Sequence, residues 1–330
     1  MMERLAKTAV IGLFAATLLW GGAAGGARQS FEIVTGSPAG SLFAAGEAIA
    51  RVISHPPGLP RCEKKDVCGP PGVVVSVRSS DGAVANVLAV DNGSAASGLA
   101  QDTVVAQAVA GRGPFRKAGR QSHIRVIAAL FPVSMQLVAA NRAHIRKVGD
   151  LKGKRVSLGP EGSGGGMIAG DILTAFGVKR VKRIRESYET SAELLQQGKL
   201  DAFFYLGAVP SPMIADVLSR GAAHLVSIDG KGRSRLLARL PRLSAATINL
   251  GQGPLASVGC RVLWIANDAA PPQTVYGLVR ALNHPANRSL LQEGLPAEDI
   301  RPGLPQPLLP LHSGAERYYR ETGLLPAIRR

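Results

Sequence analysis

The residues best suited to chemistry in this sequence are small and polar, and they gather in four loops. The loops read TGSPAGSLF (35–43), RSSDGAVAN (78–86), LAQDT (99–103) and GPEGSGGGM (159–167), each between an expected strand and an expected helix. The first turn of a helix has free backbone N–H groups with partial positive charge, which suit a carboxylate. Each loop alone fits an ordinary turn. Four together predict a polar cleft lined by backbone.

The loop at 159–167 has glycine spacings that two nucleotide-binding motifs also use. A P-loop requires a lysine and a hydroxyl residue after its last glycine, because they contact the terminal phosphates and magnesium. Gly165 and Gly166 occupy those positions here. The dinucleotide fingerprint requires a third glycine, and Met167 replaces it. Both motifs are therefore incomplete.

A carboxylate fits this loop better than a phosphate does. A helix expected from about Gly165 presents free N–H groups, and Ser163 adds a hydroxyl donor. Gly162 and Gly164 allow a close approach to the backbone, because they carry no Cβ. The loops at 36–41 and 79–82 are expected to hold the rest of the ligand. The alternative is a tight turn without a ligand.

Motifs for catalysis and metal binding are lacking in the sequence. Gly-x-Ser-x-Gly and His-Glu-x-x-His do not occur, and the six histidines show no ligand spacing. Asp81, Asp102 and Glu161 are expected near the cleft, although Asp81 is equally suited to cap a helix. We therefore predict no catalytic residue, no cofactor and no metal.

The three cysteines predict one disulfide and one buried thiol. Cys62 and Cys68 are separated by five residues, which is wrong for a redox Cys-x-x-Cys pair. In an oxidising compartment they are expected to close a small surface loop as a disulfide. Cys260 lies in the apolar run VGCRVLWIA and is expected to be a buried strand residue.

The N-terminus has the form of a secretory signal peptide. Arg4 and Lys7 precede an apolar run at 8–20, and small residues follow it. A run of this length is short of the ~20 residues that span a bilayer. We expect cleavage after Ala27, with Ala24 as the second choice and an uncleaved anchor as the alternative. The protein is accordingly expected in the periplasm.

Charge and length narrow the class of protein further. The net charge is +16, but the basic residues are spread along the chain with few aromatics among them. This distribution is typical of a solvated basic surface, so we do not expect a nucleic-acid partner. About 300 mature residues exceed one compact core and predict two lobes.

Apolar strand patterns alternate with helical patterns along most of the chain, which predicts α/β sheets with mainly parallel strands. Strands are expected at 31–35, 73–78, 124–131, 155–158, 202–205 and 258–266, and helices at 41–53, 81–90, 167–176, 191–197, 272–282 and 314–322. In the last helix, Ser313 and Glu316 form a capping-box pattern and Gly323 marks the end. Tyr318 and Tyr319 are expected to pack rather than to contact ligand.

These loops, together with the segments VGDLKGKRVSLGPEGSG, GKLDAFFY and LHSGAERYYRETGLL, resemble the TAXI family of TRAP-associated extracytoplasmic solute receptors. The resemblance runs from about Phe31 to Leu325. It implies a type II periplasmic-binding-protein fold with a ligand cleft between two lobes. Lobe I would comprise 28–130 and 262–330, and lobe II the inserted residues 131–261.

The resemblance also implies a function without catalysis. Family members bind small organic acids or amino acids, such as glutamate or a 2-oxo acid, and deliver them to TRAP membrane permease subunits without ATP. We expect a monomer. The alternatives are an exported binding protein that serves a sensor or another transporter, and an enzyme of the same fold.

Four departures from the family pattern leave the ligand's identity open. Leu42 replaces an aromatic residue, Ala83 replaces a serine, Thr103 alters an Ala-Gln-Ser-Asp motif, and Ala208 replaces a glycine. The aromatic side chains at 43 and 205 are expected to face each other across the cleft. The full set of expected ligand-binding residues is Gly36, Ser37, Gly40, Ser41, Phe43, Ser79, Ser80, Gly82, Gln101, Gly162, Ser163, Gly164 and Tyr205.

Overall fold

The computed structural model describes residues 29–250, 253–293, 303–304 and 309–325. The expected signal peptide at 1–27 lies outside this range. Within it, no helix combines the length and the apolar character that crossing a membrane requires.

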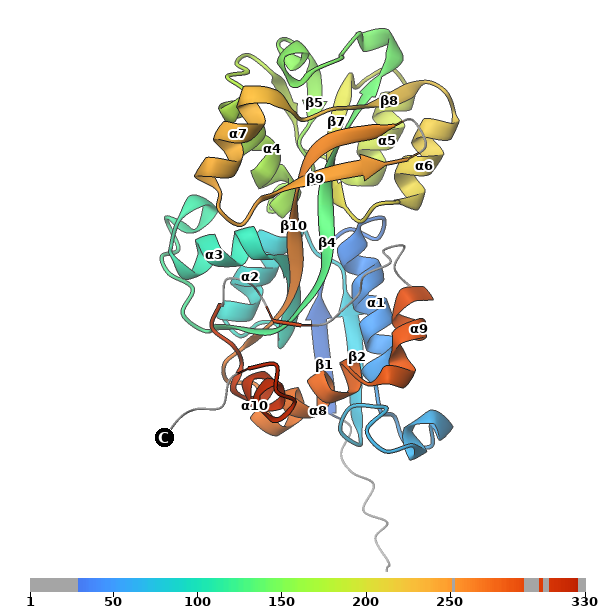
Figure 1. Ribbon diagram of the computed structural model, residues 1–330, viewed down its shortest axis with the longest axis vertical. Helices are drawn as coiled ribbons and strands as arrows, with labels where there is room; N and C mark the ends of the chain where they lie inside the picture. The colour runs from blue at the N-terminus through green and yellow to red at the C-terminus, as the bar shows by residue number, and fades with distance from the viewer. Residues whose placement is uncertain (1–28, 251–252, 294–302, 305–308, 326–330) are drawn as a thin grey trace, which may run out of the picture.

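Two long antiparallel strands form the spine of the molecule. β4 (Ile124–Ala140) and β10 (Pro254–Asn267) run side by side through both halves of the structure (Figure 1). At ~3.3 Å per residue, the 17 residues of β4 extend roughly 56 Å. The sheet order is β2-β1-β3-β10-β4-β7-β5-β6, with β8 on β4 and β9 on β10. One continuous sheet therefore joins two lobes.

Lobe I is the lower half in Figure 1. Its outer strands β1, β2 and β3 are parallel to one another, and β3 pairs with β10. Its elements are β1 (Gln29–Val34), α1 (Ser41–Ile53), η1 (Pro60–Glu63), β2 (Val73–Arg78), α2 (Ala83–Asp91), β3 (Ser97–Gln101), α3 (Asp102–Val109), η2 (Gly113–Phe115), α8 (Pro272–Leu282), η5 (Pro285–Asn287), α9 (Arg288–Glu293) and α10 (Ser313–Glu321).

Lobe II is the upper half. Strands β5, β6 and β7 are parallel, and β4 joins them to β10. Its elements are η3 (Asn141–Ala143), η4 (Val148–Leu151), β5 (Arg155–Ser157), α4 (Gly164–Ala175), β6 (Lys182–Ile184), α5 (Tyr188–Gln196), β7 (Ala202–Gly207), α6 (Pro212–Ser219), β8 (Ala223–Val226), α7 (Gly230–Arg239) and β9 (Ser244–Asn249).

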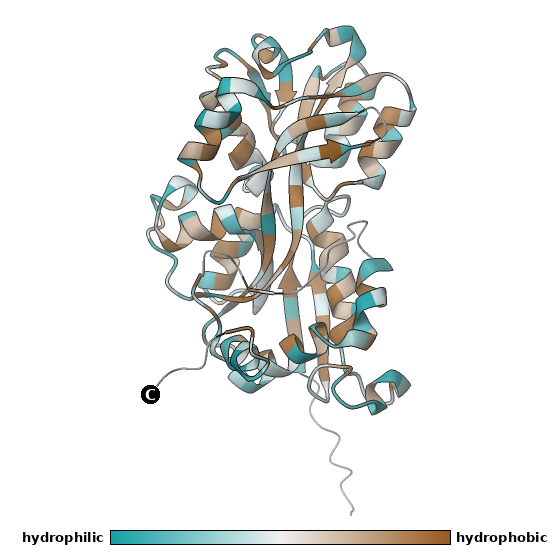
Figure 2. Cartoon of the chain, in the orientation of Figure 1, coloured by the Kyte–Doolittle hydropathy of each residue, from teal (hydrophilic) through white to brown (hydrophobic). Residues whose placement is uncertain are grey.

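Helices cover both faces of the lobe I sheet. The consecutive residues Ile33 and Val34 of β1 belong to different apolar clusters, because neighbouring side chains of a strand point to opposite faces. Ile33 packs in the cluster that contains α1 and α8, and Val34 in the one that contains α2 and α3. Figure 2 shows apolar residues along much of the central sheet and hydrophilic residues on the outer surfaces of the helices. The sheet therefore holds the helix N-termini in fixed positions at the edge that faces lobe II.

Several sequence predictions agree with the structure to within a few residues. The expected helices at 41–53 and 272–282 and the strand at 73–78 match α1, α8 and β2. Cys62 and Cys68 form a disulfide with a Cα–Cα distance of 5.2 Å, and Cys260 is a buried thiol on β10. The lobe limits at 130/131 and 261/262 stay a prediction, near a shift in the β4–β10 register between Arg261 and Leu263.

Two details of the sequence analysis were wrong. The strand expected at 124–131 continues to Ala140, because β4 passes without interruption into lobe II. The expected capping box of the last helix does not form, since its N-cap is His312, whose Nδ1 accepts a hydrogen bond from Gly314 N. Ser313 is instead the first helical residue.

Candidate functional site

The N-termini of four helices from both lobes meet at one small cavity. The helices are α1, α2 and α3 of lobe I and α4 of lobe II, whose N-caps are Gly40, Gly82, Gln101 and Ser163. We call this space the central cavity. Its volume is about 30 Å³, which is room for about one water molecule. The four loops singled out in the sequence therefore do come together.

Ser163 caps α4 with its own side chain. Its hydroxyl donates to Pro160 O at 2.7 Å and accepts from Gly166 N at 2.9 Å. The hydroxyl proton expected for a ligand is thus engaged within the loop. In the part of the chain that the structure describes, the N–H groups of Gly164 and Gly165 have no acceptor, so the backbone offers the donors at this point.

Gln101 brings an unpaired oxygen to the cavity. The side chain is 4% exposed, and its Oε1 has no hydrogen-bond partner among the described residues. It lies against the first turn of α4, since a Cβ on Gly164 would be 2.1 Å from Oε1. Leaving a buried acceptor unpaired costs about 1–3 kcal/mol. Gln101 is therefore suited to accept a hydrogen bond from a ligand N–H or O–H.

Glu189 of α5 links lobe II to the loop before α1. Its carboxylate accepts hydrogen bonds from Ala39 N at 2.7 Å and from Ser37 Oγ at 3.3 Å. Burial acts to raise the pKa of Glu189, but hydrogen bonds from backbone N–H groups and from the hydroxyls of Ser187 and Ser37 outweigh it and hold the pKa below its ordinary value. A carboxylate of the protein itself thus occupies one of the expected anion-binding loops.

Further contacts close the lobes against each other. Ser41 Oγ accepts from Ala208 N at 2.8 Å, and Val84 N donates to Gly162 O at 2.9 Å. At Gly82 the backbones are so close that a Cβ would lie 3.1 Å from the Cα of Ser163. The structure is therefore a closed arrangement, and a ligand larger than water enters the central cavity only when the lobes separate.

The expected ligand-binding residues divide into two groups. Those that line the central cavity are Gly36, Ser37, Gly40, Ser41, Gly82, Gln101, Ser163 and Gly164. Those that do not line it are Phe43, Ser79, Ser80, Gly162 and Tyr205.

The reasons differ within the second group. Ser80 supports the fold of the α2 loop, since its Oγ donates to Asn86 Oδ1 at 2.6 Å and accepts from Gly82 N at 3.0 Å. Ser79 is exposed, and Phe43 is half-buried on α1. Gly162 lines a neighbouring space.

The aromatic side chain at the central cavity is Tyr188, not the expected pair. Tyr205 is 1% exposed, and its ring packs edge-on against Tyr188 with centroids 4.8 Å apart. Its hydroxyl lies 3.3 Å from the hydroxyls of Ser41 and Ser211. Burial, and next the neighbouring Tyr205, raise the pKa of Tyr188 above its ordinary range. Tyr205 therefore fixes the position of Tyr188 and of the α1 loop.

A second and larger space lies between the lobes on the other side of Ser163. It has a volume of about 820 Å³ and lies between the α3–η2 segment of lobe I and α4, β6 and α7 of lobe II. We call it the arginine chamber, after the six arginines that line it: Arg112, Arg116, Arg183, Arg185, Arg239 and Arg242. Ser163 lines both spaces, and their other lining residues differ.

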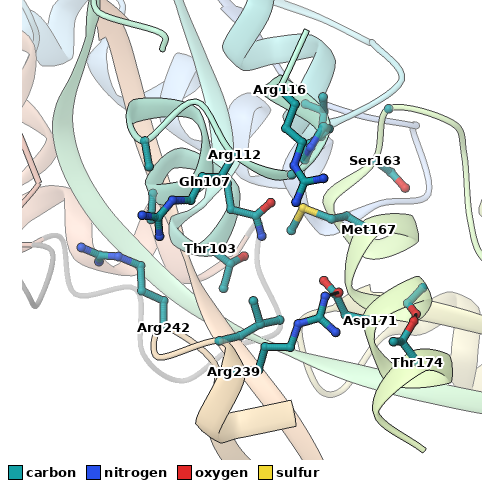
Figure 3. A pocket seen from close by; sticks show the side chains of 18 of the residues that line it. Thr103, Gln107, Arg112, Arg116, Ser163, Met167, Asp171, Thr174, Arg239 and Arg242 are labelled. Carbon is teal, nitrogen blue, oxygen red and sulfur yellow. Dashed lines mark hydrogen bonds and ion pairs between the residues drawn. The ribbon is translucent and has the colours of Figure 1, made fainter. Parts of the chain in front are cut away.

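The chamber contains two acidic residues against these six cations. Asp171 of α4 pairs with Arg239 at 3.3 Å, and Glu161 lies in the loop before α4. Burial raises the pKa of Asp171, and the charge of Arg239 opposes this effect. Figure 3 shows Gln107 and Arg116 reaching in from lobe I, with Arg239 and Asp171 on the lobe II side. The chamber is thus a basic space with charge on both walls.

Residues 33–323 match the NMT1-like family. The chain belongs to the NMT1-like family. Among the described residues, no group of three or more His, Cys, Asp or Glu side chains is placed to hold a metal ion.

Three of the solved structures that resemble this chain illustrate its fold. PhnD1 from Prochlorococcus marinus, in complex with methylphosphonate, is 12% identical, covers 90% of this chain and all (100%) of its own, and has a TM-score of 0.54. MatC from Rhodopseudomonas palustris, with bound malate, is 13% identical over 81% of this chain and 88% of its own, with a TM-score of 0.53. XAC2383 from Xanthomonas citri, bound to chloride ion, is 10% identical over 88% of this chain and 99% of its own, with a TM-score of 0.50. This NMT1-like chain therefore has the type II periplasmic-binding-protein fold.

Sequence reasoning missed Tyr188, Glu189 and the arginine chamber. Tyr188 and Glu189 open a helix that was expected to begin later, at Ser191, so they were not placed at the cleft. The chamber arginines come from three separate segments, and the motif RVKRIRE at 180–186 was the clearest local signal of them.

Proposed function

We propose that this protein is an extracytoplasmic solute receptor that captures a small carboxylate-bearing ligand between its lobes. The ligand class that the loops suit is an acidic amino acid such as glutamate, a dicarboxylate or a 2-oxo acid. Its carboxylate would meet the first turn of α4, where Gly164 and Gly165 N–H groups and the helix dipole favour negative charge.

The observation that carries this proposal is the unpaired Gln101 Oε1 beside the α4 N-terminus. A buried acceptor from lobe I and free donors from lobe II lie within one cavity. A ligand with a carboxylate at one end and an N–H or O–H nearby would satisfy both groups. It would thereby replace direct contacts between the lobes by contacts to itself.

The test is a thermal-shift screen followed by calorimetric titration of the mature chain with L-glutamate, malate and 2-oxoglutarate. A ligand that binds only the folded state at 100 times its Kd stabilises it by about 2.7 kcal/mol. For the acid that binds, Gln101→Leu should weaken affinity about tenfold, or 1.4 kcal/mol.

Gln107→Leu is the matched control for this variant. Gln107 lies on α3, the helix that Gln101 precedes as N-cap, but it lines the arginine chamber instead of the central cavity. Equal affinities of the two variants and the wild type would contradict the proposed site. Binding of none of the acids would contradict the proposed ligand class.

Delivery to a TRAP permease, export and removal of residues 1–27 also belong to this proposal. They are supported by the resemblance of the loops to the TAXI family and by the form of the N-terminus. Uptake of labelled ligand by proteoliposomes that contain TRAP permease subunits should require this receptor and an ion gradient. An absolute requirement for ATP would contradict it, and N-terminal sequencing of the periplasmic protein would locate the cleavage site.

A further inference from the structure

The arginine chamber has cations on both lobes that lack acidic partners. Arg112 and Arg116 of lobe I and Arg183 and Arg185 of lobe II line it, and no ion pair of their side chains occurs within the described ranges. Like charges on facing walls oppose lobe closure. The chamber has six arginines against only Asp171 and Glu161, so the closed arrangement carries an excess of positive charge at this point.

Arg185 lines the chamber beside the N-terminus of α4. A Cβ on Gly166 would lie 2.5 Å from its Nη1, so the guanidinium lies against the first turn of α4. The side chain and the helix N-terminus both attract negative charge at the same place. Their mutual repulsion is relieved when an anion binds between them.

Size and apolar content indicate what kind of anion fits. The volume of about 820 Å³ lies within the ~300–1,000 Å³ of ordinary ligand pockets. Met167, Pro114 and Leu240 contribute apolar surface beside the arginines, which suits a carbon skeleton. Guanidinium groups bind carboxylates and phosphates through paired N–H donors.

We propose that the arginine chamber is a second binding site, which takes an organic anion with two or more negative charges. Its charged groups contact Arg112 or Arg116 on one wall and Arg183 or Arg185 on the other, so that the anion holds the lobes closed. This site is separate from the central cavity and does not rest on the function proposed for it.

The test is calorimetric titration of the mature full chain with citrate and with pyrophosphate, and with acetate as a singly charged control. Citrate or pyrophosphate should bind and acetate should not. Preference between the two distinguishes a polycarboxylate from a phosphorylated ligand. Arg116→Gln and Arg185→Gln should each weaken the binding at least tenfold.

Arg146→Gln is the control for net charge. Arg146 is exposed, does not line the chamber, and loses the same charge in this variant. An equal loss in Arg146→Gln would show attraction to the whole basic surface and would overturn the proposal. So would the absence of citrate and pyrophosphate binding.

Gln101→Leu separates this site from the central cavity. The variant should bind citrate or pyrophosphate with wild-type affinity, whatever it does to glutamate or malate. If Gln101→Leu abolishes anion binding while Arg116→Gln and Arg185→Gln retain it, the anion occupies the central cavity and the chamber is not a site.

Discussion

The central cavity and the arginine chamber lie on either side of Ser163, and they are lined in different ways. The cavity is about 30 Å³ and is lined mainly by the loops at four helix N-termini, with Tyr188 and Gln101 beside them. The chamber is about 820 Å³ and is surrounded by long charged side chains. Backbone donors are fixed by the sheet that holds the helices, whereas guanidinium groups on long stems adapt to a ligand.

This difference bears on how each proposed site would select a ligand. The central cavity excludes by shape, because a single added Cβ at Gly82 or Gly164 would meet atoms of the opposite lobe. The chamber attracts by charge, and such attraction weakens as ionic strength rises. Lobe closure is thus favoured by the close contacts at the central cavity and opposed by the repulsion between arginines at the chamber.

Among the variants that test this difference between the two spaces, Gly164→Val is expected to have the largest effect on affinity. The new Cβ would lie 2.1 Å from Gln101 Oε1 and 3.0 Å from Val104 Cγ2, so both side chains would have to shift before the lobes could close at the central cavity. Affinity for its ligand should fall at least a hundredfold, about 2.8 kcal/mol. Gly170→Val is the control on the same helix, because a Cβ there meets nothing within 4 Å. Calorimetry that gives both variants wild-type affinity for the acid would refute the cavity as the site.

A smaller effect is expected from Asp102→Asn. Asp102 follows Gln101, which lines the central cavity, and precedes Thr103, which lines the chamber. Asp102 begins α3, and its Oδ1 accepts from Thr103 N at 2.7 Å and from Arg261 N at 3.3 Å. Burial raises its pKa from 3.8 to about 6, although these hydrogen bonds and the charges of Arg242 and Arg261 lower it. The buried thiol of Cys260 lies nearby.

The sign of the pH effect follows from this shift. Between about pH 4 and 6 the folded state binds more protons at Asp102 than the unfolded state does, so its contribution to stability falls as pH rises. The pKa difference corresponds to about 3 kcal/mol at most. The free energy of unfolding should therefore be measured by denaturant at pH 4, 5, 6 and 7. That of Asp102→Asn should rise relative to that of the wild type across this range. A constant difference between the two proteins would mean that the carboxylate is not neutralised in the folded state.

The sequence predicted the backbone-lined cavity well because its signal is local. Strand, small polar loop and helix follow one another within about ten residues, as at 31–53, and parallel strands bring such loops to one edge. The same locality explains why α1 and β2 were predicted to the residue. Their apolar positions repeat with a helical or a strand period, and glycine or proline precedes each.

Features that depend on distant segments could not be predicted in this way. Proline usually ends a strand, but β4 continues past the exposed Pro132. It does so because β10 pairs with β4 along this stretch, where Arg261 lies opposite Pro132. The arginine chamber needs 112–116, 183–185 and 239–242 to meet, and no periodicity links them. The His312 cap was missed because Ser313 is the commoner type of N-cap residue.

The smallest effect is expected from Glu189→Gln, which tests what holds the ligand-free lobes together. The carboxylate joins α5 to Ser37 and Ala39 of the α1 loop, and its pKa lies below the ordinary 4.5. A lowered pKa means stability that is present above about pH 4.5 and is lost as pH falls through the folded-state pKa. Since Glu189 is partly exposed, we expect its charge to favour closure by only about 1 kcal/mol.

Small-angle scattering of the ligand-free chain at pH 7 and pH 4 would measure this contribution. The wild type should become less compact on acidification, and Glu189→Gln should be less compact at pH 7 and change little. Glu193→Gln, on the exposed side of the same helix, should behave as the wild type does. If Glu189→Gln stays as compact as the wild type, the contacts of Ser41 and Gly162 hold the lobes without it. Glu189 would then merely occupy the α1 loop until a ligand carboxylate displaces it, and the variant should bind the ligand more tightly.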